Sequence, residues 1–195
     1  MSDLIRIFES TLRFLALLLY SVFLIDCSSA SEVRSQTSRQ IPVVMGKSFL
    51  VGHTGEHKQD SQEILQIMNR LVAGTISKNL DFLPELVSEK EGLFIDVKGQ
   101  WTKEQLRSEL LKDQNYFQIY FFENELLQKQ KGKKEVRTVR ELFLASGGIE
   151  ADFYYEGPLS CEVKLRFLEN KKLESELINP YFVKIGSKWV LIRLF

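Results

Sequence analysis

An Asp carboxylate beside a Tyr hydroxyl is a workable pair for proton transfer, because one group accepts a proton while the other donates a hydrogen bond. The chain offers such a pair at Asp152 and Tyr154, and a further carboxylate at Asp96. A surrounding apolar pocket would raise the carboxyl pKa toward the range of a general acid or base. These positions alternate with apolar ones, so we predict surface carboxylates on half-exposed strands and no catalytic residue.

Other residue types that do chemistry are sparse. The two histidines, His53 and His57, lie in the glycine-containing stretch GHTGEH. Those glycines disfavour the helix that would turn both imidazoles toward one metal ion, and no third ligand is near. The sequence also lacks G-x-S-x-G, a phosphate-cradling glycine loop and a neighbouring Cys–His pair. We therefore predict no metal and no cofactor.

The two cysteines stand in different settings. Cys161 falls on the apolar phase of an alternating run, where a thiol is usually a small core residue. Cys27 follows a run of apolar residues, 14–25, that Arg6 and Arg13 precede. A membrane-spanning helix needs about 20 apolar residues, so this shorter run favours an export signal.

The leader resembles that of bacterial lipoproteins. Leu24-Ile25-Asp26-Cys27 is similar to a relaxed, spirochaete-type lipobox, and a Ser/Gln-rich segment follows it. This resemblance implies that Cys27 carries a lipid and anchors the protein to the inner or outer membrane of the bacterial envelope. Asp26 departs from the pattern, which favours a small residue there. Two alternatives stay open: cleavage after Ala30, which releases a soluble secreted protein, and an uncleaved anchor.

Composition and patterning divide the chain into three parts. We predict a signal peptide over 1–26, a lipidated cysteine with a polar tether over 27–59, and one globular domain over 60–195. The apolar stretch 41–52 within the tether is suited to an edge strand. Lys and Arg together equal Asp and Glu at 26 each, and this neutrality argues against nucleic acid as a partner.

The domain reads as α+β, with helices packed on one face of a curved antiparallel sheet. Helix signals come first and period-two alternation dominates the end of the chain. The predicted helices are 60–76, a short one near 81–87, 102–111 and 138–146, the last two opened by capping boxes. The predicted strands are 93–97, 116–122, 149–156, 159–167, 181–185 and 188–195.

Two surface features complete the list of candidates. The predicted strand 116–122 carries Tyr116 and Tyr120 on one phase, a pattern that suits either a binding patch or a strand covered on both faces. The stretch 128–135 is rich in lysine and is predicted to be an exposed, solvated loop.

The order of these elements resembles the NTF2-like (SnoaL/cystatin-like cone) superfamily over residues 60–195. The resemblance rests on the amphipathic first helix, a short second helix at 79–81, the strand-to-helix run 92–110 and the C-terminal antiparallel meander. It implies a cone with a pocket between sheet and helices. Members use that pocket for catalysis, for ligand binding or for protein contacts. The fold alone does not determine which of these functions a given member has. We expect a non-catalytic domain that binds a protein or a small molecule; the alternative is an isomerase- or hydrolase-type enzyme with a pocket Asp/Tyr pair.

Overall fold

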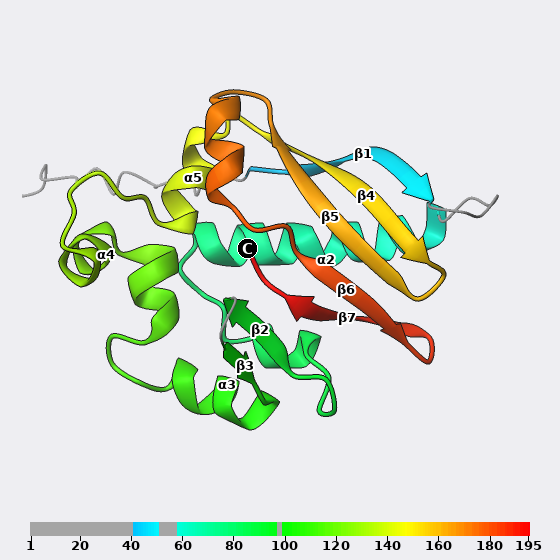
Figure 1. Cartoon of the computed structure of the whole chain (residues 1–195), viewed down its shortest axis with the longest axis horizontal. Coiled ribbons are helices and arrows are strands. Elements are labelled where there is room, and N and C mark those ends of the chain that lie inside the picture. The colour runs from blue at the N-terminus through cyan, green and yellow to red at the C-terminus, as the bar shows by residue number, and fades with distance from the viewer. Residues whose placement is uncertain (1–40, 51–57, 97–98) are drawn as a thin grey trace, which may run out of the picture. The chain divides into compact units, whose positions relative to one another are not determined.

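The computed structural model describes residues 41–50, 58–96 and 99–195, all within one structural unit. These residues form a mixed α+β domain in which seven strands make one open sheet and helix α2 crosses one of its faces (Figure 1). The predicted α+β class is therefore confirmed, but the sheet is mixed and not wholly antiparallel as predicted. The leader, Cys27, His53 and His57 lie outside the described residues.

The sheet has the strand order β1-β4-β5-β6-β7-β2-β3. Its strands are β1 (Val43–Leu50), β2 (Leu93–Asp96), β3 (Gly99–Trp101), β4 (Ile149–Gly157), β5 (Ser160–Phe167), β6 (Tyr181–Ile185) and β7 (Lys188–Arg193). Neighbours are antiparallel from β4 to β7, whereas β1 pairs parallel with β4 and β2 pairs parallel with β7. The edge strand expected within 41–52 is confirmed, so the sheet begins inside the segment assigned to the tether.

The period-two pattern of the C-terminal half fixes which face of the sheet is apolar. In the β4–β5 hairpin Phe153 lies opposite Val163 and Tyr155 lies opposite Cys161, and all four are fully buried. Alternation along an antiparallel pair places such residues on one face, against the helices. The predicted strands of this region are confirmed within one or two residues at each end.

The described helices other than α4 and η3 form where local signals predict them, with one exception. They are α2 (Lys58–Ile76), the 3₁₀ turn η1 (Leu83–Leu86), α3 (Lys103–Leu110), the π-helical turn η2 (Gln118–Phe122), α4 (Asn124–Lys131), α5 (Val139–Ala145) and the 3₁₀ turn η3 (Lys171–Glu176). Both predicted capping boxes are present: Thr102 with Gln105 opens α3, and Thr138 with Glu141 opens α5. The local capping-box signal therefore correctly predicts where both helices begin.

The exception is the aromatic stretch 116–122, where the predicted strand is wrong. The segment is helical, and Phe117 and Phe121, four positions apart, are both buried in the core. Helical spacing puts these two rings on the same side, and the adjacent Phe122 is buried as well, whereas a strand would turn Phe121 and Phe122 to opposite faces. Tertiary packing therefore overrides the β-propensity of the aromatic residues.

The lysine-rich stretch 128–135 is likewise only partly a loop. Its first half belongs to α4, which ends at Lys131 because Gly132 adopts the left-handed conformation, with φ 63°. Gln and Lys are good helix formers, and a glycine just beyond the last turn is a common stop signal. Lys133 and Lys134 follow in an exposed loop.

The core fills the space between α2 and the inner face of the sheet. Ile64, Met68 and Leu71 of α2 are fully buried, as are Phe153 of β4 and Phe182 of β6. Burial of each such side chain contributes roughly 1.5–3 kcal/mol relative to its exposure to water. Side chains therefore occupy the region where the resemblance implies a ligand pocket.

Candidate functional site

Asp152 does not lie where the sequence places it. It sits on the face of β4 turned away from α2, as predicted, but its side chain is only 1% exposed. A bulge in β1 between Met45 and Ser48 brings the backbone N–H of Lys47 onto Asp152 Oδ1 at 2.7 Å. Arg166 Nη1 donates to Asp152 Oδ2 at 3.2 Å. The prediction of a solvent-facing carboxylate is wrong here, because the bulge of the edge strand covers it.

The proposed partner of Asp152 in proton transfer is engaged elsewhere. Tyr154 is half-buried, and its ring stacks on that of Phe49 from β1, with ring centroids 4.7 Å apart and planes 14° from parallel. Both oxygens of Asp152 are meanwhile occupied by Lys47 and Arg166. The two residues therefore share a strand face without forming an acid–base pair.

Asp96 lies far from both in the sheet. It ends β2, and β5, β6 and β7 separate β2 from β4 in the strand order. Its side chain is outside the described part of the structure. The three residues considered for proton transfer therefore do not converge on one site.

Tyr116 and Tyr120 do come together, through a helical turn and not through a strand. Their rings stack with centroids 4.5 Å apart, and Trp101 contacts Tyr116 edge-on at 5.5 Å. Both tyrosines are half-buried, and Lys131 Nζ lies 5.1 Å from the Tyr120 ring. This arrangement is an aromatic cluster that packs β3, the segment around η2 and α4 together, with one edge open to solvent.

A second polar cluster lies at the N-terminal end of α2. The hydroxyls of Ser61 and Tyr155 are 2.8 Å apart, and both residues are buried. Burial raises the pKa of the neighbouring Cys161 thiol to about 12 and also raises that of Tyr155. Because the thiolate is the nucleophilic form, Cys161 stays protonated and inert at neutral pH. The interpretation of Cys161 as a core residue is confirmed.

Asp60 binds the same end of α2 to the C-terminal hairpin. Its Oδ1 accepts hydrogen bonds from Lys184 Nζ at 2.6 Å and from Trp189 Nε1 at 2.9 Å. The helix begins at Lys58, two residues before the predicted start, so Asp60 lies in its first turn. The carboxylate instead holds β6 and β7 against the helix.

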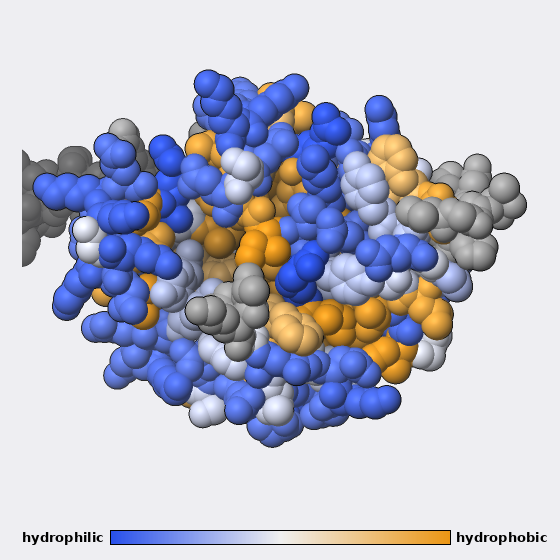
Figure 2. Space-filling model, viewed as in Figure 1, coloured by the Kyte–Doolittle hydropathy of each residue, from blue (hydrophilic) through white to orange (hydrophobic). Residues whose placement is uncertain are grey.

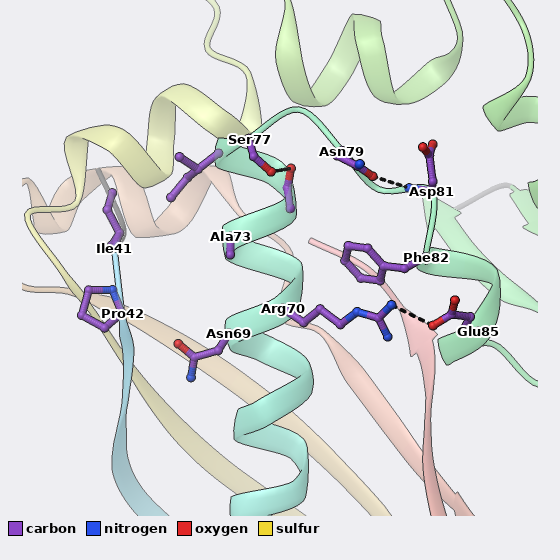
Figure 3. A pocket seen from close by; sticks show the side chains of 12 residues that line it. Ile41, Pro42, Asn69, Arg70, Ala73, Ser77, Asn79, Asp81, Phe82 and Glu85 are labelled. Carbon is purple, nitrogen blue, oxygen red and sulfur yellow. Dashed lines mark hydrogen bonds and ion pairs between the residues drawn. The ribbon is translucent and has the colours of Figure 1, made fainter. Parts of the chain in front are cut away.

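The described residues form a groove of about 1000 Å³ over the exposed side of α2 (Figure 3). Ala73 lies on its floor, Ile41 and Pro42 form one wall, and Phe82 and Glu85 form the other. We call this feature the α2 groove. Its volume is at the upper end of the range for small-molecule sites, about 300–1,000 Å³.

Each wall of the α2 groove is fixed by its own contacts. Asn69 accepts a hydrogen bond from the Val43 N–H and donates one to the Val43 carbonyl, each at 2.9 Å, so α2 holds the start of β1. On the opposite wall the Arg70 guanidinium lies 4.0 Å from the centroid of the Phe82 ring and forms an ion pair with Glu85 at 2.7 Å. The groove is thus preformed at both sides.

The floor of the groove depends on two small residues. Ala73 is exposed, and Gly74 is buried because the Asn79 carbonyl and the Phe82 ring approach it closely. Ser77 and Asn79 supply polar groups at one end, and Ile41, Pro42 and Ile76 supply apolar surface. Asp81 and Glu85 also line the groove, and Glu85 is paired with Arg70. The groove is suited to binding by shape, apolar contact and a few hydrogen bonds.

Sequence reasoning missed the α2 groove, although a signal for it exists. The side of α2 opposite the core stripe carries small residues at Ala73 and Gly74, where long polar side chains are usual on an exposed helix face. The second wall is built from Phe82, an apolar residue on the turn that follows the helix. Small residues beside a half-buried aromatic ring are a pattern that indicates a hollow.

Comparison of the chain with known protein families, with curated proteins and with solved structures gives no match. Within the described ranges, no helix has the length and apolar character needed to cross a bilayer. The same residues bring no three His, Cys, Asp or Glu side chains into an arrangement that would hold a metal ion.

Proposed function

We propose that this chain is a bacterial envelope lipoprotein whose α+β domain binds a protein or small-molecule partner in the α2 groove. Lipid anchoring is supported by the order of sequence features at the N-terminus: a basic start, a short apolar run and Cys27, followed by a polar segment. The observation that carries the binding half is the preformed groove beside Ile41. The lipid on Cys27 supplies the membrane attachment.

An NTF2-like topology is part of this proposal. The six strands β4-β5-β6-β7-β2-β3 form the sheet with α2 across one face, and the helix–turn–hairpin–helix order precedes the four-stranded meander. This order supports the resemblance drawn from the sequence. Strand β1 and the segment from η2 to α5 are additions to that pattern.

A non-catalytic role agrees with the filled interior. Phe153, Tyr155 and Phe182 occupy the space between helix and sheet, and Asp152 lies on the other face of the sheet with both oxygens engaged. The enzyme alternative requires a carboxylate in an apolar pocket. These contacts support binding over proton transfer.

The groove also lies where the tether joins the domain. Ile41, in the wall of the groove, follows the polar segment 28–40 directly in the chain. Fourteen residues from Cys27 to Ile41 span at most about 50 Å when fully extended. A partner in the α2 groove would therefore be held within that distance of the membrane surface.

Metabolic labelling with palmitate, followed by intact mass measurement, tests the anchor in a bacterium that processes lipoproteins. We expect label on the wild type and on Cys161→Ala, and no label on Cys27→Ala. Asp26→Ala should label more completely, because it restores a small residue before the cysteine. A mature chain that begins at Ser31, or an unlabelled chain that begins at Met1, would refute lipidation.

Site-specific photo-crosslinking in cells tests the groove. A photoreactive phenylalanine analogue at Ala73, on the floor, should give a discrete adduct. The same analogue at Ser108, an exposed position on α3 that does not line the groove, is the matched control. Equal adducts at both positions, or none at Ala73, would rule the groove out as the binding site.

A further inference from the structure

We infer that the outer face of the sheet carries a second site, a basic pocket that binds a terminal phosphate group. Lys47 of β1, Arg166 of β5 and Lys171 of η3 line a hollow of about 180 Å³, with Glu150 as its acidic member. We call it the basic pocket. It lies on the side of the sheet opposite α2 and is separate from the α2 groove.

Like charges from three separate elements converge on the basic pocket. Lys47 and Lys171 form no ion pair with any described residue, and Arg166 is paired only with Asp152 among those residues. Like charges brought together in a concavity repel one another, and an anion between them relieves that repulsion. The chain as a whole is neutral, so this local excess is not a consequence of composition.

The guanidinium of Arg166 is held in place from beneath by Asp152. Asp152, 1% exposed, accepts from Arg166 Nη1, while its other oxygen accepts from the Lys47 N–H. One buried carboxylate therefore positions residues on two walls of the pocket. Because Arg166 is half exposed, its remaining N–H donors are open to a ligand. Arginine is well matched to phosphate, since its planar fork donates two parallel hydrogen bonds.

Positively charged side chains continue beyond the basic pocket. A wider hollow of about 560 Å³ shares Lys171 and adds Lys164 and Lys172, with Glu174 as its acidic member. Hydrophilic side chains cover η3 and the strands beside it in Figure 2. The larger body of a ligand would lie in this second hollow, with its phosphate in the first.

The volume of the basic pocket indicates which chemical class of ligand it can hold. One water molecule takes about 30 Å³ in the liquid, so a hollow of this volume holds one tetrahedral oxyanion with a few waters. A phosphomonoester or a pyrophosphate end fits that description. The phosphate comes either from a soluble molecule or from a lipid headgroup that ends in a monoester.

Two binding assays on the full chain purified in detergent separate these sources. Equilibrium dialysis with ³²P-pyrophosphate at low salt reports free phosphate, and flotation with vesicles containing phosphatidic acid reports a headgroup. In one assay or both, we expect Lys47→Ala and Lys171→Ala each to weaken binding about tenfold, the loss of one charge-assisted contact. Glu150→Gln should strengthen binding, because it removes the opposing charge.

Lys129→Ala is the matched control. It removes an exposed lysine from α4, outside the basic pocket, and should leave binding unchanged. If Lys47→Ala and Lys171→Ala weaken pyrophosphate binding in the dialysis assay, the ligand is a soluble molecule. If they weaken only the binding to vesicles, the ligand is a lipid headgroup. If neither assay depends on Lys47 and Lys171, or if Lys129→Ala weakens binding as much, the site does not exist. Urea unfolding of each variant confirms that the fold is intact.

Discussion

The backbone N–H of Lys47 donates a hydrogen bond of 2.7 Å to Oδ1 of Asp152, a residue 105 positions further along the chain. This bond joins the bulge of the edge strand β1 to the strand β4 beside it. The same carboxylate holds Arg166 at 3.2 Å. One buried side chain therefore attaches β1 to the sheet and orients the guanidinium of the basic pocket.

Replacement of Asp152 should loosen the edge strand. Asp152→Ala leaves the Lys47 N–H without its acceptor and removes the partner of the half-exposed Arg166, so we expect a loss of about 1–3 kcal/mol in the free energy of unfolding. Asp152→Asn keeps an acceptor for the Lys47 N–H and should cost about half as much. Urea unfolding measures both. Glu150→Ala on the same strand is the control, with a change within about 0.5 kcal/mol; an equal loss there would contradict the argument.

The burial of Asp152 shows where the sequence stops being informative. Alternation along β4 correctly predicts the outer face, but the cover over Asp152 comes from the bulge near Gly46, about a hundred residues away. The capping boxes at Thr102 and Thr138 were predictable because their partners lie three residues along the chain. Structural features whose interacting residues are close in the sequence can be predicted from it. Contacts between residues far apart in the sequence can be identified only once the fold is known.

The same distinction explains the aromatic segment and the α2 groove. The local composition of 116–122 favours a strand, yet the adjacent Phe121 and Phe122 are both buried in the core, which a strand with one covered face would not allow. The α2 groove needs Ile41 and Phe82 on opposite sides of Ala73, and no periodicity of the sequence places them there. Tertiary packing decides both.

The buried hydroxyl pair of Ser61 and Tyr155 should contribute measurably to stability. Tyr155→Phe removes one partner of a 2.8 Å hydrogen bond and leaves the Ser61 hydroxyl buried. We expect a loss of about 1–2 kcal/mol in the free energy of unfolding. Tyr181→Phe is the matched control, because its hydroxyl donates to Glu156 at the exposed surface. That variant should change stability by less than about 0.5 kcal/mol. Similar losses in the two variants would refute a special role for the buried pair.

Cys161 should make the stability of the domain fall in alkaline solution. Burial raises the pKa of its thiol from 9.0 to about 12, so between these values the unfolded chain has lost a proton that the folded chain keeps. The slope of the free energy of unfolding against pH is negative wherever the folded state holds more protons. The stabilisation from the neutral thiol is complete below pH 9.0 and is lost as the pH rises toward about 12.

The difference between wild type and Cys161→Ala tests this effect, because groups away from Cys161 titrate equally in both proteins. Cys161 also raises the pKa of Tyr155, so the loss of that influence in the variant shifts the difference in the same direction. We expect Cys161→Ala to be less stable than wild type at pH 7, since it leaves a small cavity. The difference in the free energy of unfolding should shrink at pH 9.5 and shrink further at pH 10.5. A difference that is constant across this range would show that the thiol does not titrate differently in the two states.

Gly74→Ala tests the floor of the α2 groove. Alanine is favoured over glycine within a helix by about 1 kcal/mol, so propensity alone predicts a gain in stability. The new Cβ, however, would lie 2.5 Å from the Asn79 carbonyl oxygen and 2.7 Å from the Phe82 ring. The first contact is with backbone, which cannot rotate away, and relief of such overpacking costs about 1–3 kcal/mol. We therefore expect a net loss, measured by urea unfolding, together with displacement of Phe82 from the wall of the groove. Gly157→Ala, whose Cβ would meet no atom within 4 Å, should be close to neutral. If Gly74→Ala proved more stable than wild type, Phe82 would not pack against α2 as the structure shows, and the second wall of the groove would be lost with it.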